Sequence, residues 1–428
     1  MMKRKKFIQQ IGKGLALSTL PMAYTNVAAS AAVTPKKPEE KVPDGIYRPE
    51  GYHLVWEDDF KSNKLDESEW FYRRDIKMNS AQRPENVSVA DGRLLLAMKQ
   101  EDFLGMRYTG AGIVSKRRWQ HGYYEVKAKL TNAKGWHHSF WAQEGTGFLT
   151  FSSDRSMEID IFEMESTKAS NHNLWIYPDG WSSRQKKWHS VPNKDLGFDA
   201  ADDYHIYGYE YTTEGIKFFV DGKITHTIEA PEEDHKHYSL NLWLTVIATQ
   251  TNVETKLPVY DYIEYIRCYA KDPDAPLPPK WEPAYEKGTT IYIDNSDAWG
   301  FNMGDYWEIA AEGNFYGHNY YKYKRKETYN PLRDWALFRP FISEAGNYDI
   351  YLRWVAGADR CSKVPLEIWY DGGLKNDTTK SINQQEHNGE WVKIGNYPFR
   401  QGWNNLIKLI VRNTGYVIAD AAKFVKTS

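Results

Sequence analysis

The chain has 428 residues, a formal net charge of −2 and 15% aromatic side chains. The balance of acidic and basic residues excludes the one-signed charge field typical of nucleic-acid-binding proteins, and the length predicts two or three domains that each bury a core. Beyond the N-terminal region there is no run of about 18 apolar residues, so no membrane span is expected.

The N-terminal segment has the layout of a signal peptide. Basic residues dominate positions 1–6, an apolar stretch follows, and small residues lead up to the cleavage expected near Ala31. We therefore predict a signal peptide over 1–32 and export to the periplasm or the cell exterior. Residues 33–50 are rich in proline and charge and are expected to form a linker.

A second proline-rich stretch, 271–287, is the predicted linker between two modules, 51–270 and 288–428. Both modules contain the strongest short signal for a β-hairpin, an Asp-Gly pair between strand-forming residues. These pairs are Asp91-Gly92, Asp221-Gly222 and Asp371-Gly372. Helical periodicity is scarce, so the sequence predicts an all-β chain with two β-sandwiches, the second smaller than the first.

Three acidic residues share one predicted strand near position 160. Side chains alternate faces along a strand, so Glu158 and Asp160 share a face, whereas Glu163 would point into the core, where an unpaired carboxylate is very costly. One extra residue in a β-bulge at about Ile161-Phe162 would reverse this parity. We expect the bulge to bring all three acids onto one surface.

Carboxyl groups on one surface are what a retaining glycosidase needs, with two of them about 5–5.5 Å apart across the scissile bond. One attacks the anomeric carbon, and the other protonates the leaving oxygen and then activates water. Crowding makes the two groups unequal, because like charges raise at least one pKa. The alternatives for this segment are a solvated acidic edge strand and part of a calcium site.

The spacing Glu158-x-Asp160-x-x-Glu163 resembles the bulged signature of glycoside hydrolase family 16, which includes laminarinases, agarases, porphyranases and carrageenases. Further similar segments lie at 56–60, 110–115, 122–126, 140–141, 204–211 and 262–267. The resemblance implies a concanavalin-like β-jelly-roll with a concave cleft and a retaining, endo-acting O-glycosyl hydrolase. It implies Glu158 as nucleophile, Asp160 as assisting acid and Glu163 as acid/base.

Aromatic side chains near the acids are candidates for stacking on sugars, because a ring complements the apolar face of a pyranose. The resemblance places Trp141 near the cleavage point, with ordinary sheet packing as the alternative. The other substrate-binding candidates are Trp119, Trp136, His138 and Trp175. The alternative for His138 is an exposed loop position, and for Trp175 a hydrophobic loop anchor.

The expected substrate is a β-linked polysaccharide. Residues 135–139 depart from the Trp-Pro pattern common in laminarinases, and the basic groups at 73–74 and 116–118 suit sulfate unless they are a solvated face. We therefore expect an algal sulfated galactan such as agar, porphyran or carrageenan. A β-1,3-glucan is the runner-up, and a mucin-type glycan cut by an endo-β-galactosidase stays open.

No cofactor is required by this chemistry, and the protein is expected to be a monomer. Family members often carry a structural calcium ion, for which Asp59 and Glu264 are candidate ligands. Cys268 and Cys361 are expected to be free or buried.

The second module resembles the accessory β-sandwich of golvesin-like and xanthan-lyase-like proteins, through segments 292–296, 346–351 and 417–421. This resemblance implies polysaccharide binding, with core packing or docking on the first module as alternatives. Its candidate stacking residues are Trp299, Trp307, Tyr316 and Trp335.

Two rival functions stay open. A polysaccharide-binding protein on a hydrolase scaffold would bind sugar without turnover, although the presence of all three acids favours an enzyme. Transglycosylation would use the same covalent intermediate with a sugar as acceptor, and the sequence does not separate it from hydrolysis.

Overall fold

The computed structural model describes residues 48–143, 156–177, 187–229, 239–280, 288–297, 300–304, 306–325, 328–331 and 333–428. The predicted signal peptide, most of the first linker and Trp299 lie outside the described residues. Regular structure in the described part consists of strands and one 3-10 turn, η1 (Pro84–Asn86), so the all-β prediction is confirmed. That part also has no helix long and apolar enough to cross a membrane.

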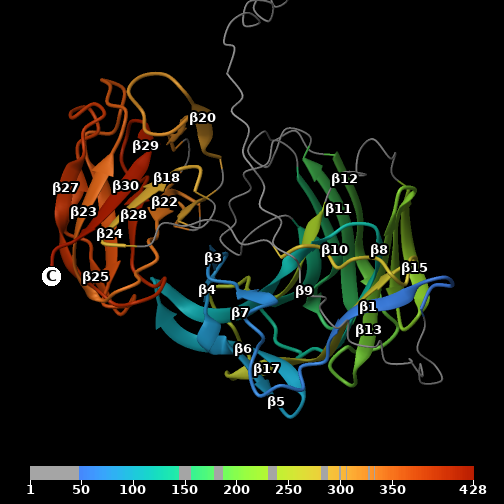
Figure 1. Ribbon diagram of the computed structural model, residues 1–428. Coiled ribbons are helices and arrows are strands. Elements are labelled where there is room, and N and C mark those ends of the chain that lie inside the picture. Colours follow the sequence, from blue (N-terminus) through green and yellow to red (C-terminus); the bar gives the residue numbers. More distant parts are fainter. Residues whose placement is uncertain are drawn as a thin grey trace, which may run out of the picture. The chain divides into compact units, whose positions relative to one another are not determined.

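The first module contains two facing sheets, the jelly-roll sandwich that was expected (Figure 1). One sheet has the order β5-β6-β17-β8-β13-β14-β15, and β1 also pairs with β17. Its strands are β1 (His53–Asp58), β5 (Val87–Ala90), β6 (Arg93–Phe103), β8 (Gly122–Lys129), β13 (His205–Thr212), β14 (Gly215–Val220), β15 (Lys223–Glu229) and β17 (Val259–Ala270).

The second sheet of this module has the order β2-β7-β16-β9-β10-β11-β12. Its strands are β2 (Trp70–Tyr72), β7 (Met106–Trp119), β9 (Trp136–Gln143), β10 (Ser156–Ser166), β11 (Ala169–Tyr177), β12 (Lys187–Asp195) and β16 (Leu240–Ala248). The β6–β7 hairpin joins the two sheets. Two short strands lie beside it, β3 (Ile76–Lys77) and β4 (Ser80–Gln82), of which β4 pairs with β7 in parallel.

Apolar side chains from both sheets fill the space between them. Leu94 and Val126 from one sheet and Phe140 and Ile159 from the other are 0% exposed and belong to one hydrophobic cluster. Because successive side chains on a strand face opposite ways, residues next to these core positions point out of the sandwich. The outward face of β9, β10 and β16 therefore carries the polar side chains of the candidate site.

The turns follow the Asp-Gly pairs. Asp91 and Gly92 join β5 to β6 with φ angles of 52° and 68°, and Asp221 and Gly222 join β14 to β15 with 47° and 75°. Two-residue hairpin turns of this kind need positive φ at both positions, which Asp and Gly tolerate. The predicted hairpins at these two positions are confirmed.

The second module has its own strands and its own hydrophobic core. Its sheets have the orders β18-β30-β23-β27, β19-β22-β28-β24-β25 with β26 on β24, and β20-β21-β29. The strands are β18 (Thr290–Asp294), β19 (Phe301–Met303), β20 (Glu308–Ala310), β21 (Tyr320–Tyr323), β22 (Trp335–Phe338), β23 (Gly346–Arg353), β24 (Val364–Tyr370), β25 (Lys375–Asp377), β26 (Ser381–Ile382), β27 (Val392–Phe399), β28 (Leu406–Ile410), β29 (Val417–Ala419) and β30 (Ala421–Lys426). Both cysteines are free and buried, as expected, Cys268 in β17 and Cys361 in this module.

Candidate active site

Strand β10 contains the predicted bulge. Asp160 lies opposite Trp141 of β9, and Phe162 lies opposite Phe140, so Ile161 has no partner of its own on that strand. The register with β11 shifts over the same stretch. The bulge reverses the parity of the strand, and the prediction that it brings the three acids onto one surface is confirmed.

A histidine on the neighbouring strand β11 hydrogen-bonds to the backbone of this bulge. The buried ring of His172 approaches the carbonyl oxygen of Ile161 through Nδ1 at 2.6 Å, and since a carbonyl only accepts, Nδ1–H is the donor. The ring also stacks on Phe218, with centroids 4.9 Å apart. Burial lowers the pKa of His172 to about 4, so the ring is neutral at physiological pH. Sequence reasoning missed this residue, whose signal is a histidine beside the predicted bulge.

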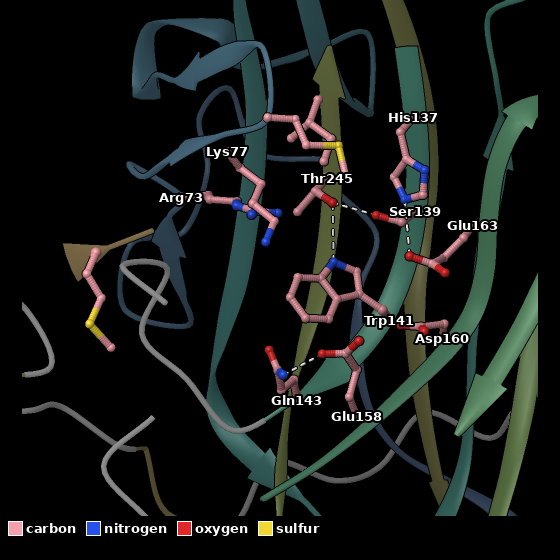
Figure 2. A pocket seen from close by; sticks show the side chains of 13 residues that line it. Arg73, Lys77, His137, Ser139, Trp141, Gln143, Glu158, Asp160, Glu163 and Thr245 are labelled. Carbon is pink, nitrogen blue, oxygen red and sulfur yellow. Dashed lines mark hydrogen bonds and ion pairs between the residues drawn. The ribbon is translucent and has the colours of Figure 1, made fainter. Parts of the chain in front are cut away.

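The three acids open into a pocket of about 250 Å³ on the outward face of this sheet (Figure 2). Figure 2 shows Glu158, Asp160 and Glu163 on one side of Trp141, and Arg73 and Lys77 on the other. The lining residues are Arg73, Lys77, Met78, His137, Ser139, Trp141, Gln143, Glu158, Asp160, Glu163, Thr245, Ile247 and Met303.

Asp160 is the buried member of the acidic group, with 1% of its surface exposed. Its Oδ2 accepts hydrogen bonds from Nδ2 of Asn173 at 3.0 Å and from Nε1 of Trp175 at 3.2 Å. The hydroxyl of Ser190 donates to Oδ1 of Asn173 at 2.6 Å, which turns the amide nitrogen toward the acids. Burial, and then the charges of the two flanking glutamates, raises the pKa of Asp160 well above its usual range.

The two glutamates have different neighbours. Nε2 of Gln143 donates to Oε2 of Glu158. Glu163 accepts a hydrogen bond from Nδ2 of Asn173 at 2.7 Å, and its Oε1 lies 3.2 Å from Nε2 of His137. Each carboxyl group is therefore oriented by an amide donor, and Glu163 also faces the imidazole of His137. The two glutamates thus differ in their hydrogen-bonding surroundings.

The opposite wall is built on a tryptophan pair. Trp141 and Trp243 stack with centroids 4.5 Å apart, and the indole N–H of Trp141 donates to Oγ1 of Thr245 at 3.2 Å. The guanidinium of Arg73 lies 5.7 and 5.6 Å from the two ring centroids and pairs with Asp75 at 2.6 and 2.9 Å. Because Asp75 neutralises Arg73, this wall offers a flat, hydrogen-bonded surface rather than a free positive charge.

Two predicted binding residues on β9 were assigned to the wrong face. Trp136 is 0% exposed and packs against Tyr108 in the core, with centroids 6.1 Å apart. His138 is also buried, and its Nδ1 lies 2.7 Å from Oδ2 of Asp261 on the facing sheet. Positions 137, 139, 141 and 143 of this strand face the pocket, and the even positions face the core. His137 is therefore the histidine of the site.

The other aromatic candidates also divide into residues at the pocket and residues in the core. Trp175 is half-buried and contacts the acidic group through its indole N–H, and Trp141 lines the pocket. Trp119 was wrongly predicted to bind substrate, because it closes the core between Trp56 and Tyr124, with ring centroids 5.8 and 5.9 Å away.

Of the predicted basic groups, only Arg73 lines the pocket. Arg117 instead forms a forked ion pair with Glu69 at 2.9 and 3.1 Å. The candidate calcium ligands are both paired with lysines, Asp59 with Lys61 and Glu264 with Lys127. No group of three or more His, Cys, Asp or Glu in the described ranges is placed to hold a metal ion, and calcium stays a prediction.

The second module buries two of its candidate stacking residues. Trp307 and Trp335 are 4% and 3% exposed and belong to hydrophobic clusters, so they were wrongly proposed as sugar platforms. Tyr316 is half-buried beside Tyr292 and Trp391, with ring centroids 6.1 and 5.5 Å away.

Comparison with known proteins adds family matches to this geometry. Residues 75–256 match the family described as Glycosyl hydrolases family 16, and residues 291–426 match the Golvesin C-terminal domain. The clotting factor G alpha subunit of Tachypleus tridentatus is 29% identical over 184 residues, which cover 40% of this chain and 26% of that protein. A beta-glucanase of Rhodothermus marinus is 27% identical over 257 residues, which cover 51% of this chain and 85% of that enzyme.

Among solved structures, porphyranase B from Zobellia galactanivorans is similar with a TM-score of 0.45 and 18% identity, over 52% of this chain and 97% of that one. The chain thus spans most of the beta-glucanase and only about a quarter of the clotting factor subunit.

Proposed function

We propose that the chain, in which residues 75–256 match the family described as Glycosyl hydrolases family 16 and residues 291–426 match the Golvesin C-terminal domain, is an endo-acting, retaining glycosidase that cleaves a β-linked polysaccharide. Members of family 16 are O-glycosyl hydrolases. The observation that carries the proposal is the bulge in β10, which directs Glu158, Asp160 and Glu163 into one pocket. Two carboxyl groups on either side of a glycosidic bond suffice for double displacement.

Glu158 is the nucleophile in this mechanism. The amide of Gln143 donates to its carboxylate and orients it for attack on the anomeric carbon. The raised pKa of Asp160 favours its protonated form. In that form Asp160 donates a hydrogen bond to a neighbouring carboxylate when that carboxylate is charged. It thereby limits the repulsion between them while the glycosyl–enzyme bond forms and breaks.

Glu163 is the acid/base. It protonates the leaving oxygen in the first step and takes a proton from water in the second, so it has to function in both protonation states. Asn173 donates to it in the ionised state, and His137 provides a second polar partner whose ring nitrogen either donates or accepts. These contacts support the acid/base role for Glu163 rather than for Glu158.

A sulfated galactan is our proposed substrate, although of the basic groups predicted from the sequence to bind sulfate only Arg73 lines the pocket. Lys77 lines the pocket and is suited to an anionic substituent, whereas Arg73 is neutralised by Asp75. A β-1,3-glucan is the second candidate, and the similarity to a beta-glucanase favours it. Trp141 and Trp175 are the residues proposed to stack on sugar rings in either case.

Reducing-end release from a polysaccharide panel tests the proposal. The panel holds agarose, porphyran, carrageenans, laminarin, mixed-linkage glucan and mucin. Glu158→Gln is expected to lower release from the cleaved substrate by at least about 10³-fold, since it removes the nucleophile. Glu165→Gln is the matched control, because Glu165 is an exposed residue of the same strand and does not line the pocket. Thermal unfolding would establish that both variants are folded.

Near-wild-type turnover in Glu158→Gln would contradict the assignment. Sugar affinity without turnover in the wild-type chain would favour the binding-protein alternative, and products longer than the donor would identify transglycosylation. Export is a further part of the proposal. N-terminal sequencing of the protein recovered outside the cytoplasm, compared with the expected cleavage near Ala31, would test it.

A further inference from the structure

The second module is packed against the strands that form the Lys77 end of the pocket. Apolar side chains of both modules share one hydrophobic cluster in which every fully buried member is at most 6% exposed. Its members include Ile76, Phe103 and Leu104 of the first module with Trp335, Leu337 and Leu406 of the second. Burial of this kind stabilises a fixed contact, in contrast to the polar interfaces typical of mobile domains.

Glycines let the two surfaces approach closely. Gly373 of the second module has a φ of 83°, and a Cβ there would lie 3.0 Å from Cε2 of Phe103. Gly105 of the first module has a φ of 79°, and a Cβ there would lie 3.3 Å from Cζ2 of Trp369. Each module therefore places a glycine in a conformation that favours glycine against an apolar side chain of the other.

A buried arginine links the second module to the backbone of the pocket wall. Arg339 is 2% exposed, and its Nη1 donates to the carbonyl oxygen of Arg74. Arg74 directly follows Arg73, which lies over the tryptophan pair, and precedes Lys77 by three residues. The guanidinium thus holds the segment that carries two lining residues.

Aromatic packing also connects the tryptophan pair of this pocket wall to the second module. Phe71 of β2 packs in one cluster with Trp141 and Trp243, and in another with Trp403 and Phe341 of the second module. The tryptophan pair of the pocket is therefore connected through one side chain to the second module.

One residue of the second module lines the pocket itself. Met303, the last residue of β19, is half-buried and shares the pocket with Lys77 and Met78. A thioether side chain is flexible and polarisable, so it adapts to the C–H face of a sugar ring. Together with the ammonium group of Lys77, which lines the same pocket, the two methionines suit a pyranose that carries a hydroxyl or an anionic substituent.

We propose that the second module builds one end of the substrate cleft, with Met303 as a specificity-determining residue and Arg339 as a positioning residue for the wall that carries Arg73 and Lys77. The inference rests on the proposed function, because it assigns a sugar-binding position to that same pocket. It makes the second module part of the catalytic unit rather than a separate sugar-binding attachment.

Kinetics with oligosaccharides of increasing length test this proposal in the full chain. We would use agarose-, porphyran- and laminarin-derived size ladders and measure kcat and KM separately for Met303→Ala. Loss of one apolar contact is expected to raise KM about fivefold, but only for oligosaccharides long enough to reach this end, and to leave kcat unchanged. The control is Ile309→Ala, which removes an exposed apolar side chain from the same module, 50% exposed in β20.

Arg339 supplies the second arm. Arg339→Met removes the donor to the Arg74 carbonyl and is expected to change both KM and the size distribution of products, whereas Arg339→Lys keeps a donor and is expected to restore part of the wild-type pattern. Thermal unfolding of each variant separates a shifted pattern from simple loss of folded protein. An unchanged KM and product pattern in Met303→Ala and both Arg339 variants would overturn the inference.

A failure of the proposed hydrolase function can be distinguished from a failure of this inference. If the wild-type chain binds a panel polysaccharide in affinity electrophoresis but does not cleave it, hydrolysis is contradicted. The Met303 contribution is then read from the retardation of Met303→Ala against Ile309→Ala in the same gel, where equal retardation would overturn it.

Discussion

Two carboxyl groups, one in each module, are buried to the same degree and differ in what surrounds them. Asp160 in β10 is 1% exposed and Asp420, directly after β29, is 0% exposed. Burial raises the pKa of both, to about 7 for Asp420. Asp420 accepts the backbone N–H of Tyr316 at 3.0 Å and lies 3.8 Å from Nε of Arg353.

The difference lies in the neighbours and not in the burial. Asp160 shares an open pocket with two other carboxyl groups, so a proton that it holds can be exchanged during a reaction. Asp420 is held by an amide and approached by a guanidinium, and although the charge of Asp294 also raises its pKa, Asp420 does not line the pocket. A raised carboxyl pKa therefore indicates a catalytic position only where space for a substrate accompanies it.

The contrast between Asp160 and Asp420 predicts that substitutions in the acidic pocket affect turnover. The largest effect is expected at Glu163, which shares the pocket with Asp160. Glu163→Ala removes the proposed acid/base and should lower hydrolysis of the polysaccharide by about 10³-fold or more. An added small anion such as azide needs no general base, so it should restore turnover of a substrate with an activated leaving group and yield a glycosyl azide of retained configuration. Chromatography and NMR of the product would check this, and an azide product of inverted configuration would contradict double displacement.

The direct comparison is between Asp160→Asn and Asp420→Asn. The first removes an exchangeable proton from the acidic group and is expected to lower kcat by about 100-fold, while the second is expected to leave kcat unchanged. Both substitutions keep size and a hydrogen-bond acceptor. Equal activities of the two variants in the reducing-end assay would remove the distinction drawn between the two sites.

A smaller effect is expected at His137. Replacing it by Ala removes a polar partner of Glu163, and we expect about a tenfold loss of kcat/KM. His137→Gln retains a side-chain donor and should recover part of this loss. Equal kcat/KM values for wild type and His137→Ala would show that the imidazole only fills space.

The smallest effect is a change of stability with pH in the second module. Asp420 has a folded-state pKa of about 7, above the ordinary aspartate value of 3.8, so the stability it contributes is complete below about pH 3.8 and is lost as the pH rises to about 7. Asp420→Asn should remove this slope and raise stability near pH 8 by on the order of 1–3 kcal/mol. Calorimetry at pH 5 and pH 8 would measure it, and an identical slope in variant and wild type would contradict the assignment.

The sequence was sufficient to predict features that depend on local pattern. The Asp-Gly turns follow from backbone conformation, and the bulge in β10 follows from the cost of burying Glu163. The alternation of side-chain faces along β9 could also have corrected the predicted binding roles of Trp136 and His138. Once Trp141 is placed in the cleft, His137 must share its face, and His138 must face the core.

Features that depend on distant segments could not be predicted in this way. The ion-pair partner of Arg73 is only two residues away in the sequence. The position of the Arg73 guanidinium over Trp141 and Trp243, by contrast, depends on how β2 pairs with β7. The contribution of Met303 depends on packing between modules whose contacts are separated by more than 200 residues. No sequence periodicity encodes such contacts, because they arise from the fit of two finished surfaces.

The two cysteines give each module a thiol of its own. Cys268 is 0% exposed in β17 and Cys361 is 1% exposed in the second module, and burial raises the pKa of both thiols. A thiol reagent reaches such a side chain only when the surrounding structure opens, so the labelling rate measures the frequency of that opening. Because each cysteine occupies a different hydrophobic core, mass spectrometry of the labelled chain would time the opening of the two modules separately in one sample, without any engineered probe.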